Sequence, residues 1–313
     1  MTSQTKSGIS LLFSYAVQIA KTRGFGKGRF FFLRSLLFPK AATNWIIFID
    51  NFFKKAGFNN APWDVVATPL RLCLSNNFNA QTRSEKIQSH CEIIEKKFNK
   101  EFLKTILKGN ETRIAVLSGK SGCIYELTFC YALVYRREGF LTVFLKDTSG
   151  KNLILSTITF TFFKNDEGSN SMLIGGLQGV PANVQIEDGK GLVVKSTRDL
   201  QGLRPKYAVL NCAYAIASCF DVNKIFAVSS KNHPVRLTNK RRSREFYADY
   251  DSFWQEVGGV VKADGNFELP SILPKRSAEE VPAKKKKDWL ARYVHIDNIS
   301  AMTKENLNLM FNR

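Results

Sequence analysis

The sequence predicts an α+β protein, in which N-terminal helices precede an antiparallel β-meander and then alternating helices and strands. Three patterns predict this fold class. Apolar residues recur at helical spacing in residues 9–20, alternate with polar ones in residues 125–133, and form a helical stripe again after Pro205. Helix-period and strand-period patterns therefore occupy successive blocks of the chain.

The first block is helical and basic. Between Ile9 and Ala20, apolar side chains lie three and four positions apart, as on an amphipathic helix. The following segment, Lys21–Phe38, mixes basic residues with phenylalanines and glycines. Such an arm can lie on an anionic membrane surface, or its phenylalanines can pack into the core, and the second reading is favoured. Further helices are expected over Trp45–Phe58 and from Ser84, as N-cap, to Gly109.

The middle of the chain has the two-residue period of a strand with two unequal faces. Short glycine-containing turns (RREG, DTSGK and NDEGSN) separate the apolar runs, as in an antiparallel meander. The expected strands are Tyr125–Leu133, Phe140–Lys146, Leu153–Phe163 and Met172–Leu177.

The last block alternates helix and strand. The expected elements are a helix with Pro205 in its first turn, a buried strand at Lys224–Ser229, a short helix at Tyr250–Val257, an edge strand at Phe267–Leu269, an exposed loop over Pro274–Lys287 and a final helix from about Asp288. The chain thus divides into a basic helical region (1–77), an α+β core (78–273) and a basic loop with a C-terminal helix (274–313).

Charge and cysteine usage restrict the partners and the compartment. The chain has 46 Lys and Arg against 27 Asp and Glu, a formal net charge of +19, which favours an anionic ligand, lipid or membrane surface. Nucleic acid ranks lower because no nucleic-acid-binding motif accompanies the basic runs. The six cysteines show no paired spacing, and no leader or membrane-spanning window is evident. We expect a cytoplasmic protein, with peripheral contact to the inner membrane as an open alternative.

Glycines and basic residues gather between Ser171 and Lys206. Gly175, Gly176, Gln178 and Gly179 read as a glycine turn at the end of a strand, which could present backbone N–H groups to a phosphate. The alternative is a tight turn that needs positive φ.

Three basic residues flank the next turn. Arg198, Arg204 and Lys206 surround an Arg-Pro step at a helix start, where an anion is favoured. An arginine paired with a carboxylate such as Asp199 or Glu187 is the competing interpretation.

His233 is the candidate catalytic residue, because a histidine after a buried strand is well placed for a general base. A structural histidine bonded to the backbone is the competing reading. No ligand spacing links the three histidines to cysteines, so no metal site is predicted. The basic runs at 240–244 and 284–287 read as solvated faces, with anionic lipid as the alternative.

Six ordered motifs resemble the VirK/YbjX family of Gram-negative bacteria, which has plasmid-borne members. They are IGGLQG, DLQGLRPK, FAVSSKNH, YADYDSFWQEVGG, FELP and KKKKDWLARY, between Ile174 and Tyr293. The resemblance implies virulence, envelope integrity, resistance to antimicrobial peptides and correct localisation of a surface protein. It implies no settled enzyme activity.

The element order also resembles the acyl-CoA N-acyltransferase superfamily, in which two strands splay apart to admit the pyrophosphate of coenzyme A. This likeness is at fold level, and folds host many functions. Two function hypotheses therefore stand: an envelope accessory protein, which leads, and an acyltransferase. The second would bind acyl-CoA or acyl-carrier protein at Gly175–Gly179 and Arg204, with His233 as base. No cofactor is indicated beyond acyl-CoA under that alternative.

Overall fold

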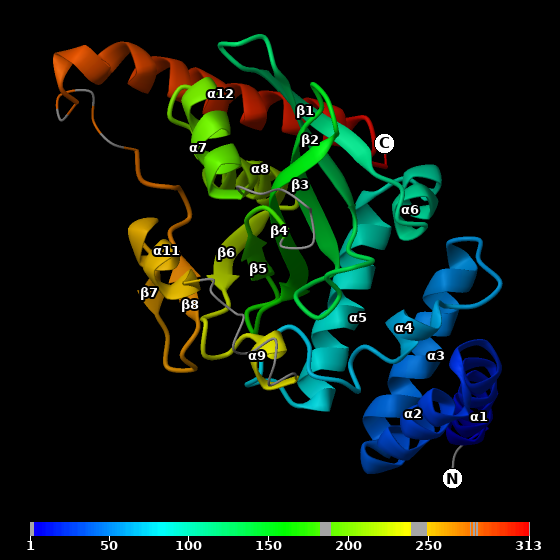
Figure 1. Ribbon diagram of the computed structural model, residues 1–313. Coiled ribbons are helices and arrows are strands. Elements are labelled where there is room, and N and C mark those ends of the chain that lie inside the picture. Colours follow the sequence, from blue (N-terminus) through cyan, green and yellow to red (C-terminus); the bar gives the residue numbers. More distant parts are fainter. Residues whose placement is uncertain are drawn as a thin grey trace.

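A computed structural model describes residues 3–181, 189–238, 249–275, 277, 279 and 281–312 (Figure 1). Its centre is an eight-stranded sheet in the order β1-β2-β3-β4-β5-β6-β8-β7. Neighbours from β1 to β5 are antiparallel, β5 and β6 are parallel, and β8 is antiparallel to both β6 and β7. The strands are β1 (Thr112–Ser118), β2 (Ile124–Tyr131), β3 (Leu141–Asp147), β4 (Leu153–Lys164), β5 (Asn170–Gln178), β6 (Val222–Ala227), β7 (Val260–Val261) and β8 (Phe267–Leu269).

Helices precede, connect and follow these strands, so the predicted α+β class is confirmed. They are α1 (Ser3–Arg23), α2 (Phe25–Leu37), α3 (Pro39–Lys55), α4 (Trp63–Val66), α5 (Ala80–Lys97), α6 (Lys100–Leu107), α7 (Gly189–Asp199), α8 (Pro205–Cys219), α9 (Pro234–Thr238), α11 (Tyr250–Glu256) and α12 (Ala283–Asn308).

The helices form two groups around the sheet. Helices α1, α2 and α3 pack on one another beside the sheet, and α3 joins them to it through α5 (Figure 1). Helix α8 lies across β3, β4, β5 and β6, and α12 lies on α8 and β1. The crossover between the parallel strands β5 and β6 contains α7 and α8.

Helix α5 completes the hydrogen bonding of β4 where that strand outruns β3. The last residue of β4 aligned with β3 is Phe160, opposite Leu141. Beyond it, the backbone N–H of Phe162 donates to His90 Nδ1 at 3.1 Å, and that of Lys164 donates to Ser89 Oγ at 2.8 Å. These bonds satisfy an edge that would otherwise expose unpaired N–H groups.

Several element boundaries differ from the sequence-based prediction. Strand β1 was not predicted, because the residues that follow Gly109 do not alternate clearly between apolar and polar side chains. Helix α5 begins at Ala80 under an Asn79 cap, whose side chain accepts from Thr82 N at 2.9 Å, rather than at Ser84. The predicted edge strand β8 is internal, since β7 pairs on its outer side.

The C-terminal boundary differs as well. Helix α12 begins at Ala283, inside the predicted exposed loop, because Pro282 precedes a first turn of lysines that favour helix.

The basic segment Lys21–Phe38 is mostly helix α2, and its phenylalanines are divided between two environments. Phe31 is buried in the core, whereas Phe25 and Phe30 are 75% and 54% exposed. The favoured reading, that these rings pack into the core, therefore holds for only part of the segment.

All six cysteines are unpaired. Among the described helices, none combines the length and hydropathy needed to cross a membrane.

Phe98 is the junction of the helical and sheet layers. Its ring lies 4.8 Å from that of Phe102 in α6, 6.1 Å from Phe129 in β2 and 5.3 Å from Phe220 at the end of α8. It also contacts Phe311 at 5.7 Å, and the two residues form an isolated β-bridge. A side chain shared by so many elements contributes to each of their packing energies.

We expect Phe98→Ala to lower the free energy of unfolding by about 3–5 kcal/mol, because it leaves a cavity among aromatic rings. Denaturant unfolding followed by circular dichroism measures this difference. The exposed ring of Phe25 provides the matched control, and Phe25→Ala should change stability by less than about 0.5 kcal/mol. Equal losses in both variants would contradict the assignment.

Candidate functional site

Strands β5 and β6 run side by side for only part of their length. Their register ends at Ile174 opposite Ala227, and the last backbone bond runs from Val228 N to Ile174 O at 2.9 Å. Strand β5 continues to Gln178 paired with β4 alone. A bulge in that pairing leaves Gly175 as an extra residue, which changes the direction of the backbone groups that follow. The two parallel strands thus diverge at Gly175.

Side chains replace the missing strand pairing. The Leu177 N–H donates to Tyr250 Oη at 3.3 Å, where β6 would otherwise lie. The Trp254 indole N–H donates to the Val228 carbonyl at 3.0 Å, at the end of β6. His233 is hydrogen-bonded to the Gly175 backbone, and its ring centre lies 5.3 Å from that of Tyr250. Helix α11 and the segment after β6 therefore fill the opening between the strands.

Glu138 is the acidic residue of this opening. It comes from the turn between β2 and β3 and is 4% exposed. A Cβ on Gly175 would lie 1.7 Å from the Glu138 carbonyl oxygen, and one on Gly176 would lie 1.9 Å from Glu138 Oε2. The glycine pair therefore makes room for Glu138 against the face of β5.

Two polar side chains, Gln178 and His233, lie close to the Glu138 carboxyl group. Gln178 Nε2 donates to Glu138 Oε1 at 2.7 Å, and His233 Nε2 lies 3.7 Å from the same oxygen. Burial raises the pKa of Glu138 to about 8, which outweighs the opposite effect of the Gln178 hydrogen bond. Since this pKa lies near neutrality, the carboxyl can exchange a proton at physiological pH.

The imidazole of His233 is neutral at the same pH. It is fully buried, and burial lowers its pKa to about 4, although its bond to Gly175 acts in the opposite direction. The Val235 N–H donates to His233 Nδ1 at 3.4 Å, so the neutral ring carries its proton on Nε2. At physiological pH His233 is therefore neutral, whereas Glu138 is present in both its protonated and its ionised form.

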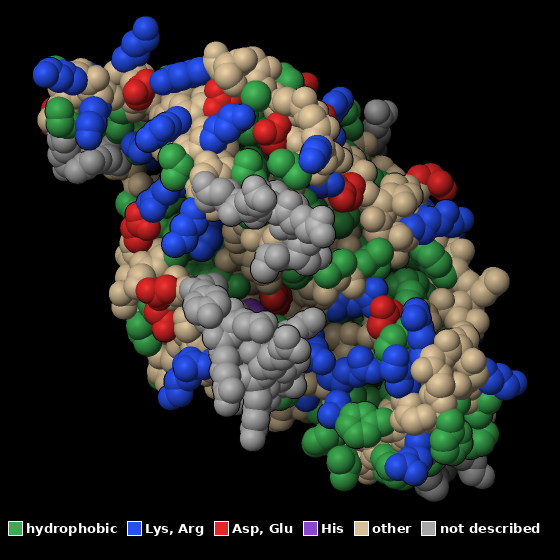
Figure 2. Space-filling view, viewed as in Figure 1, with side chains coloured by type: hydrophobic (Ala, Val, Ile, Leu, Met, Phe, Trp, Pro, Cys, Tyr) green, Lys and Arg blue, Asp and Glu red, His purple; other side chains and the backbone are tan. Residues whose placement is uncertain are grey.

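A cavity of about 470 Å³ reaches Glu138 from the side of the N-terminal helices. Its lining includes Glu138, Gln178, Tyr135, Arg71, Arg136 and Arg137, and we call it the Glu138 cavity. The face drawn in Figure 2 is hollowed near its middle, with acidic and histidine side chains at the floor. Lys and Arg side chains border the hollow toward the N-terminal helices in that view.

The structure gives the predicted glycine motif a different local role. Gly175 and Gly176 lie within β5, where close approach of Glu138 requires them, and not in a turn. Neither they nor Gly179 has positive φ, so the tight-turn interpretation is also wrong. Gln178 ends the strand beside Glu138, and Gly179 follows it. Gly175, Gly176, Gln178 and His233 are therefore brought together around Glu138.

The predicted basic residues lie at other cavities. Arg204 and Lys206, with Gly179, line a cavity of about 290 Å³ at the start of α8, which we call the α8 cavity. Burial is the main cause that lowers the Lys206 pKa, and the neighbouring Arg204 charge lowers it further. Arg198 lines a third cavity, of about 410 Å³, with Lys285 and Trp289 of α12. The three cations are close in the sequence, but the fold places Arg198 at a different cavity from Arg204 and Lys206.

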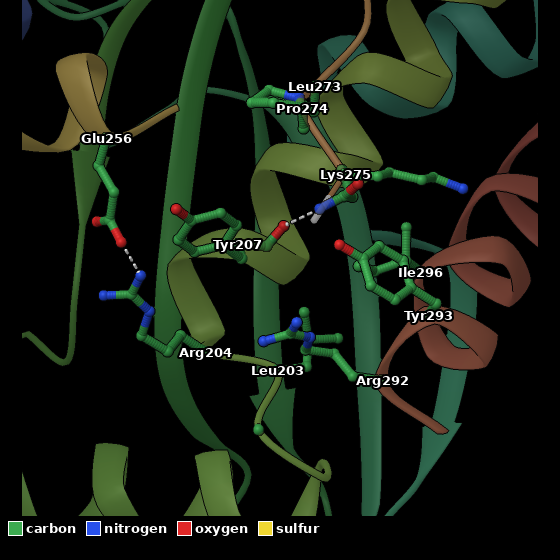
Figure 3. Close-up of a pocket in the computed structure, with 12 residues that line it drawn as sticks. Leu203, Arg204, Tyr207, Glu256, Leu273, Pro274, Lys275, Arg292, Tyr293 and Ile296 are labelled. Carbon is green, nitrogen blue, oxygen red and sulfur yellow. Dashed lines mark hydrogen bonds and ion pairs between the residues drawn. The ribbon is translucent and has the colours of Figure 1, made fainter. Parts of the chain in front are cut away.

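Arg204 also borders the cavity of about 530 Å³ drawn in Figure 3. In that view Arg204 and Glu256 lie on one side of the cavity, and Arg292, Tyr293 and Ile296 of α12 lie on the other. Arg204 forms an ion pair with Glu256, instead of the Asp199 or Glu187 considered from the sequence. Both partners are about half exposed, so the pair holds Arg204 only weakly.

The remaining residues considered from the sequence either have structural roles or lie outside the residues that the structure describes. Asp199 accepts from the Ser121 N–H and from the Tyr125 hydroxyl, so it ties α7 to the sheet. The basic run 240–244 and Glu187 lie outside the described residues. Within the described part of the chain, no cluster of His, Cys, Asp and Glu has the grouping of a metal site.

Sequence analysis missed the two residues that define the opening, Glu138 and Tyr250. Glu138 stands in the RREG segment, which reads as an ordinary turn, and Tyr250 reads as the first residue of a short helix. The adjacent glycines at 175–176 were the available signal, because a glycine pair inside an apolar strand marks a close approach by another group.

A family model described as "Protein of unknown function (DUF535)" matches residues 22–305. The Escherichia coli (strain K12) protein YbjX is 27% identical over 305 residues, which cover 95% of this chain and 89% of that protein. Two proteins of Haemophilus influenzae are 28% identical over 143 residues, or 45% of each chain, and 22% identical over 233 residues, or 74% of each chain.

One solved structure, a cAMP-binding acyltransferase from Mycobacterium smegmatis, aligns with a TM-score of 0.29 and 12% identity. The alignment covers 64% of this chain and 60% of that one. A likeness of this size carries no argument about function.

We expect Gly175→Ala to destabilise the protein by about 1–3 kcal/mol, because the new methyl group would collide with the Glu138 backbone. Thermal or denaturant unfolding measures the loss. Gly179→Ala is the matched control, since no atom lies within 4 Å of its added Cβ. If the two alanines were equally tolerated, the close packing of Glu138 on β5 would be disproved.

The raised pKa of Glu138 predicts a pH dependence of stability. An unfolded glutamate titrates at 4.5, so the stability that the protonated carboxyl contributes is complete below that pH and is lost as pH rises through about 8. Glu138→Gln keeps the shape and cannot ionise. Its stability relative to the wild type should therefore rise between pH 5 and pH 9, by the order of a few kcal/mol.

Unfolding free energies measured across this range test the prediction. The difference between variant and wild type cancels the contribution of His233, which acts in the opposite pH direction. A difference that stays constant with pH would mean that Glu138 titrates normally.

Proposed function

The chain belongs to the VirK/YbjX family, and from this premise we propose that it is an accessory protein of the bacterial envelope whose chemistry is acyl transfer. The family resemblance supports the setting: virulence, envelope integrity, resistance to antimicrobial peptides and correct localisation of a surface protein. The geometry supports the chemistry. The observation that carries it is a buried carboxyl group of raised pKa, held where two parallel strands diverge.

The divergence of β5 and β6 is the feature that suggests an acyl-CoA or acyl-carrier-protein donor. In the N-acyltransferase superfamily, diverging strands admit the donor, with its pyrophosphate at the following helix. Here Tyr250 and His233 occupy the inner part of the divergence, so the donor would lie at its outer end, in the α8 cavity. Here Gly179 follows β5, and Arg204 and Lys206 stand at the start of α8, on one cavity. A helix start with two cations is suited to a pyrophosphate. The weak Arg204–Glu256 pair can open to release the guanidinium for it.

Glu138 is the proposed general base. In the reaction, an amine or hydroxyl of the acceptor attacks the thioester carbonyl, and a C–N or C–O bond forms. The C–S bond breaks, and the thiol leaves with one proton. The ionised Glu138 takes the proton from the attacking group and returns it to the leaving thiolate. A pKa of about 8 suits this exchange, because both forms are populated near physiological pH.

His233 keeps a role in this proposal, although it changes from the predicted base to a positioning residue. It does not line the Glu138 cavity, whereas Glu138 does. Its Nε2 lies 3.7 Å from Glu138 Oε1, so the buried ring would position the carboxyl by packing against it.

We expect purified protein to transfer acyl groups from acyl-CoA or acyl-carrier protein, with a rate that rises with pH through about 8. Thiol release measures the reaction, and calorimetry measures donor binding. Glu138→Gln should lower the rate roughly 10²–10⁴-fold and leave donor affinity unchanged. Lys206→Gln should show the reverse pattern, with weaker donor binding.

His233→Asn separates positioning from base catalysis, since it should shift the pH midpoint while keeping a pH-dependent rate. No donor binding at any chain length would rule out acyl transfer. In cells, a deletion strain should lose peptide resistance and surface-protein placement. Restoration by the wild type and not by Glu138→Gln would link the chemistry to the envelope role, and full restoration by both would separate them.

A further inference from the structure

Three arginines from different segments converge at the outer end of the Glu138 cavity. Arg71 and Arg137 line it, from the segments after α4 and after β2. Arg34 approaches from α2, where its Nη1 donates to the Leu70 carbonyl at 3.4 Å, next to Arg71. We call these residues the arginine cluster.

The cluster is electrostatically unfavourable without an anion. Burial is the main cause that lowers the pKa of both Arg34 and Arg71, and the neighbouring arginine charges lower it further. In the part of the chain that the structure describes, no carboxylate lies within ion-pair distance of any of the three. Adjacent Arg136, in contrast, pairs with Asp64. Like charges gathered without compensation favour an anionic ligand.

The positive region extends to the junction of α1 and α2. Trp63 has Arg71 at 5.1 Å from its ring centre, Arg23 at 5.3 Å and Lys27 at 5.9 Å. The indole thus holds three cations on the side of the cavity that faces the N-terminal helices.

Helix α2 carries an exposed apolar surface beside the cluster. Phe30, Leu33 and Leu37, at spacings of three and four, are 54%, 49% and 71% exposed. Arg34 lies on the same helical face, with its guanidinium 4.2 Å from the centre of the Phe30 ring. Phe25, Leu36 and Phe38 are exposed nearby. Figure 2 shows hydrophobic and basic side chains side by side on the N-terminal helices.

We propose that the arginine cluster binds the phosphate group of an anionic membrane lipid, while the exposed apolar side chains of α2 enter the membrane interface. Apolar side chains next to cations are the features of a helix that lies on an anionic bilayer. A free phosphate needs only the cluster, so the apolar face is what favours a lipid. The bound headgroup would lie at the entrance to the Glu138 cavity. From this position the lipid would serve as the acyl acceptor, and in this respect the inference rests on the proposed function.

The test is binding of the full chain to phosphatidylcholine vesicles with and without phosphatidylglycerol. We expect binding only to the anionic vesicles, and a loss of about tenfold or more in Arg71→Gln/Arg137→Gln. Arg137→Gln alone, which keeps the Trp63 stack intact, should lose part of the affinity. The matched control is Lys284→Gln/Lys286→Gln on α12, which removes the same charge elsewhere and should lose less.

The apolar face is tested separately, and Phe30→Ser/Leu37→Ser should also weaken vesicle binding. If the arginine and lysine variants lost equal vesicle affinity, binding would depend on net charge alone, and the proposed arginine site would be overturned. Binding of inorganic pyrophosphate that Arg71→Gln/Arg137→Gln abolishes, without vesicle binding, would assign the cluster to a soluble phosphate. Self-association abolished by Phe30→Ser/Leu37→Ser, without vesicle binding, would assign the apolar face to a second copy.

Vesicle binding needs no turnover, so it distinguishes this inference from the acyl-transfer proposal. Glu138→Gln should bind anionic vesicles as the wild type does. If the wild-type protein binds the lipid but transfers no acyl group, the phosphate site stands. Only the inference that the bound lipid is the acyl acceptor is then overturned.

Discussion

The packing of Glu138 against two glycines of β5 is the constraint on which the candidate site depends. A carboxyl group can be this deeply buried only if it becomes neutral or finds partners, and here Gln178 donates a hydrogen bond to it while burial raises its pKa. The bulge at Gly175 turns the strand so that His233 and Tyr250 can bond to it. Strand divergence, carboxyl burial and the neutral histidine therefore form one arrangement, in which each part requires the others.

Much of the fold could be predicted from the sequence, because strand and helix periods are local properties of the chain. The four meander strands and the helix after Arg204 follow from residue spacing alone. The site could be predicted only in part. Gly175, Gly176, Gln178 and His233 were singled out, but their common partner Glu138 lies about 40 residues upstream in a turn, and no local pattern relates the two. Long-range packing is not encoded in periodicity.

The distribution of charge shows the same limit. A net charge of +19 predicts contact with an anion but does not locate it. Of the cations singled out after the glycine motif, Arg198 on α7 lines a different cavity from Arg204 and Lys206 at the start of α8. The cations that do converge are Arg34, Arg71 and Arg137. Arg34 belongs to the basic arm and Arg137 to the RREG turn, and no element was predicted at Arg71. Convergence is a consequence of the tertiary fold.

The contact between α12 and β1 has a consequence for how the chain folds. Asn306 of α12 donates to the Ile114 carbonyl of β1 at 3.1 Å, across 192 positions of the sequence. The meander can form from neighbouring segments, but its first strand lacks its covering helix until the chain has been synthesised as far as α12. Contacts at such separations slow folding, and an uncovered outer strand can pair with another molecule in the meantime. During biosynthesis β1 is therefore an outer strand without its covering helix until α12 has formed.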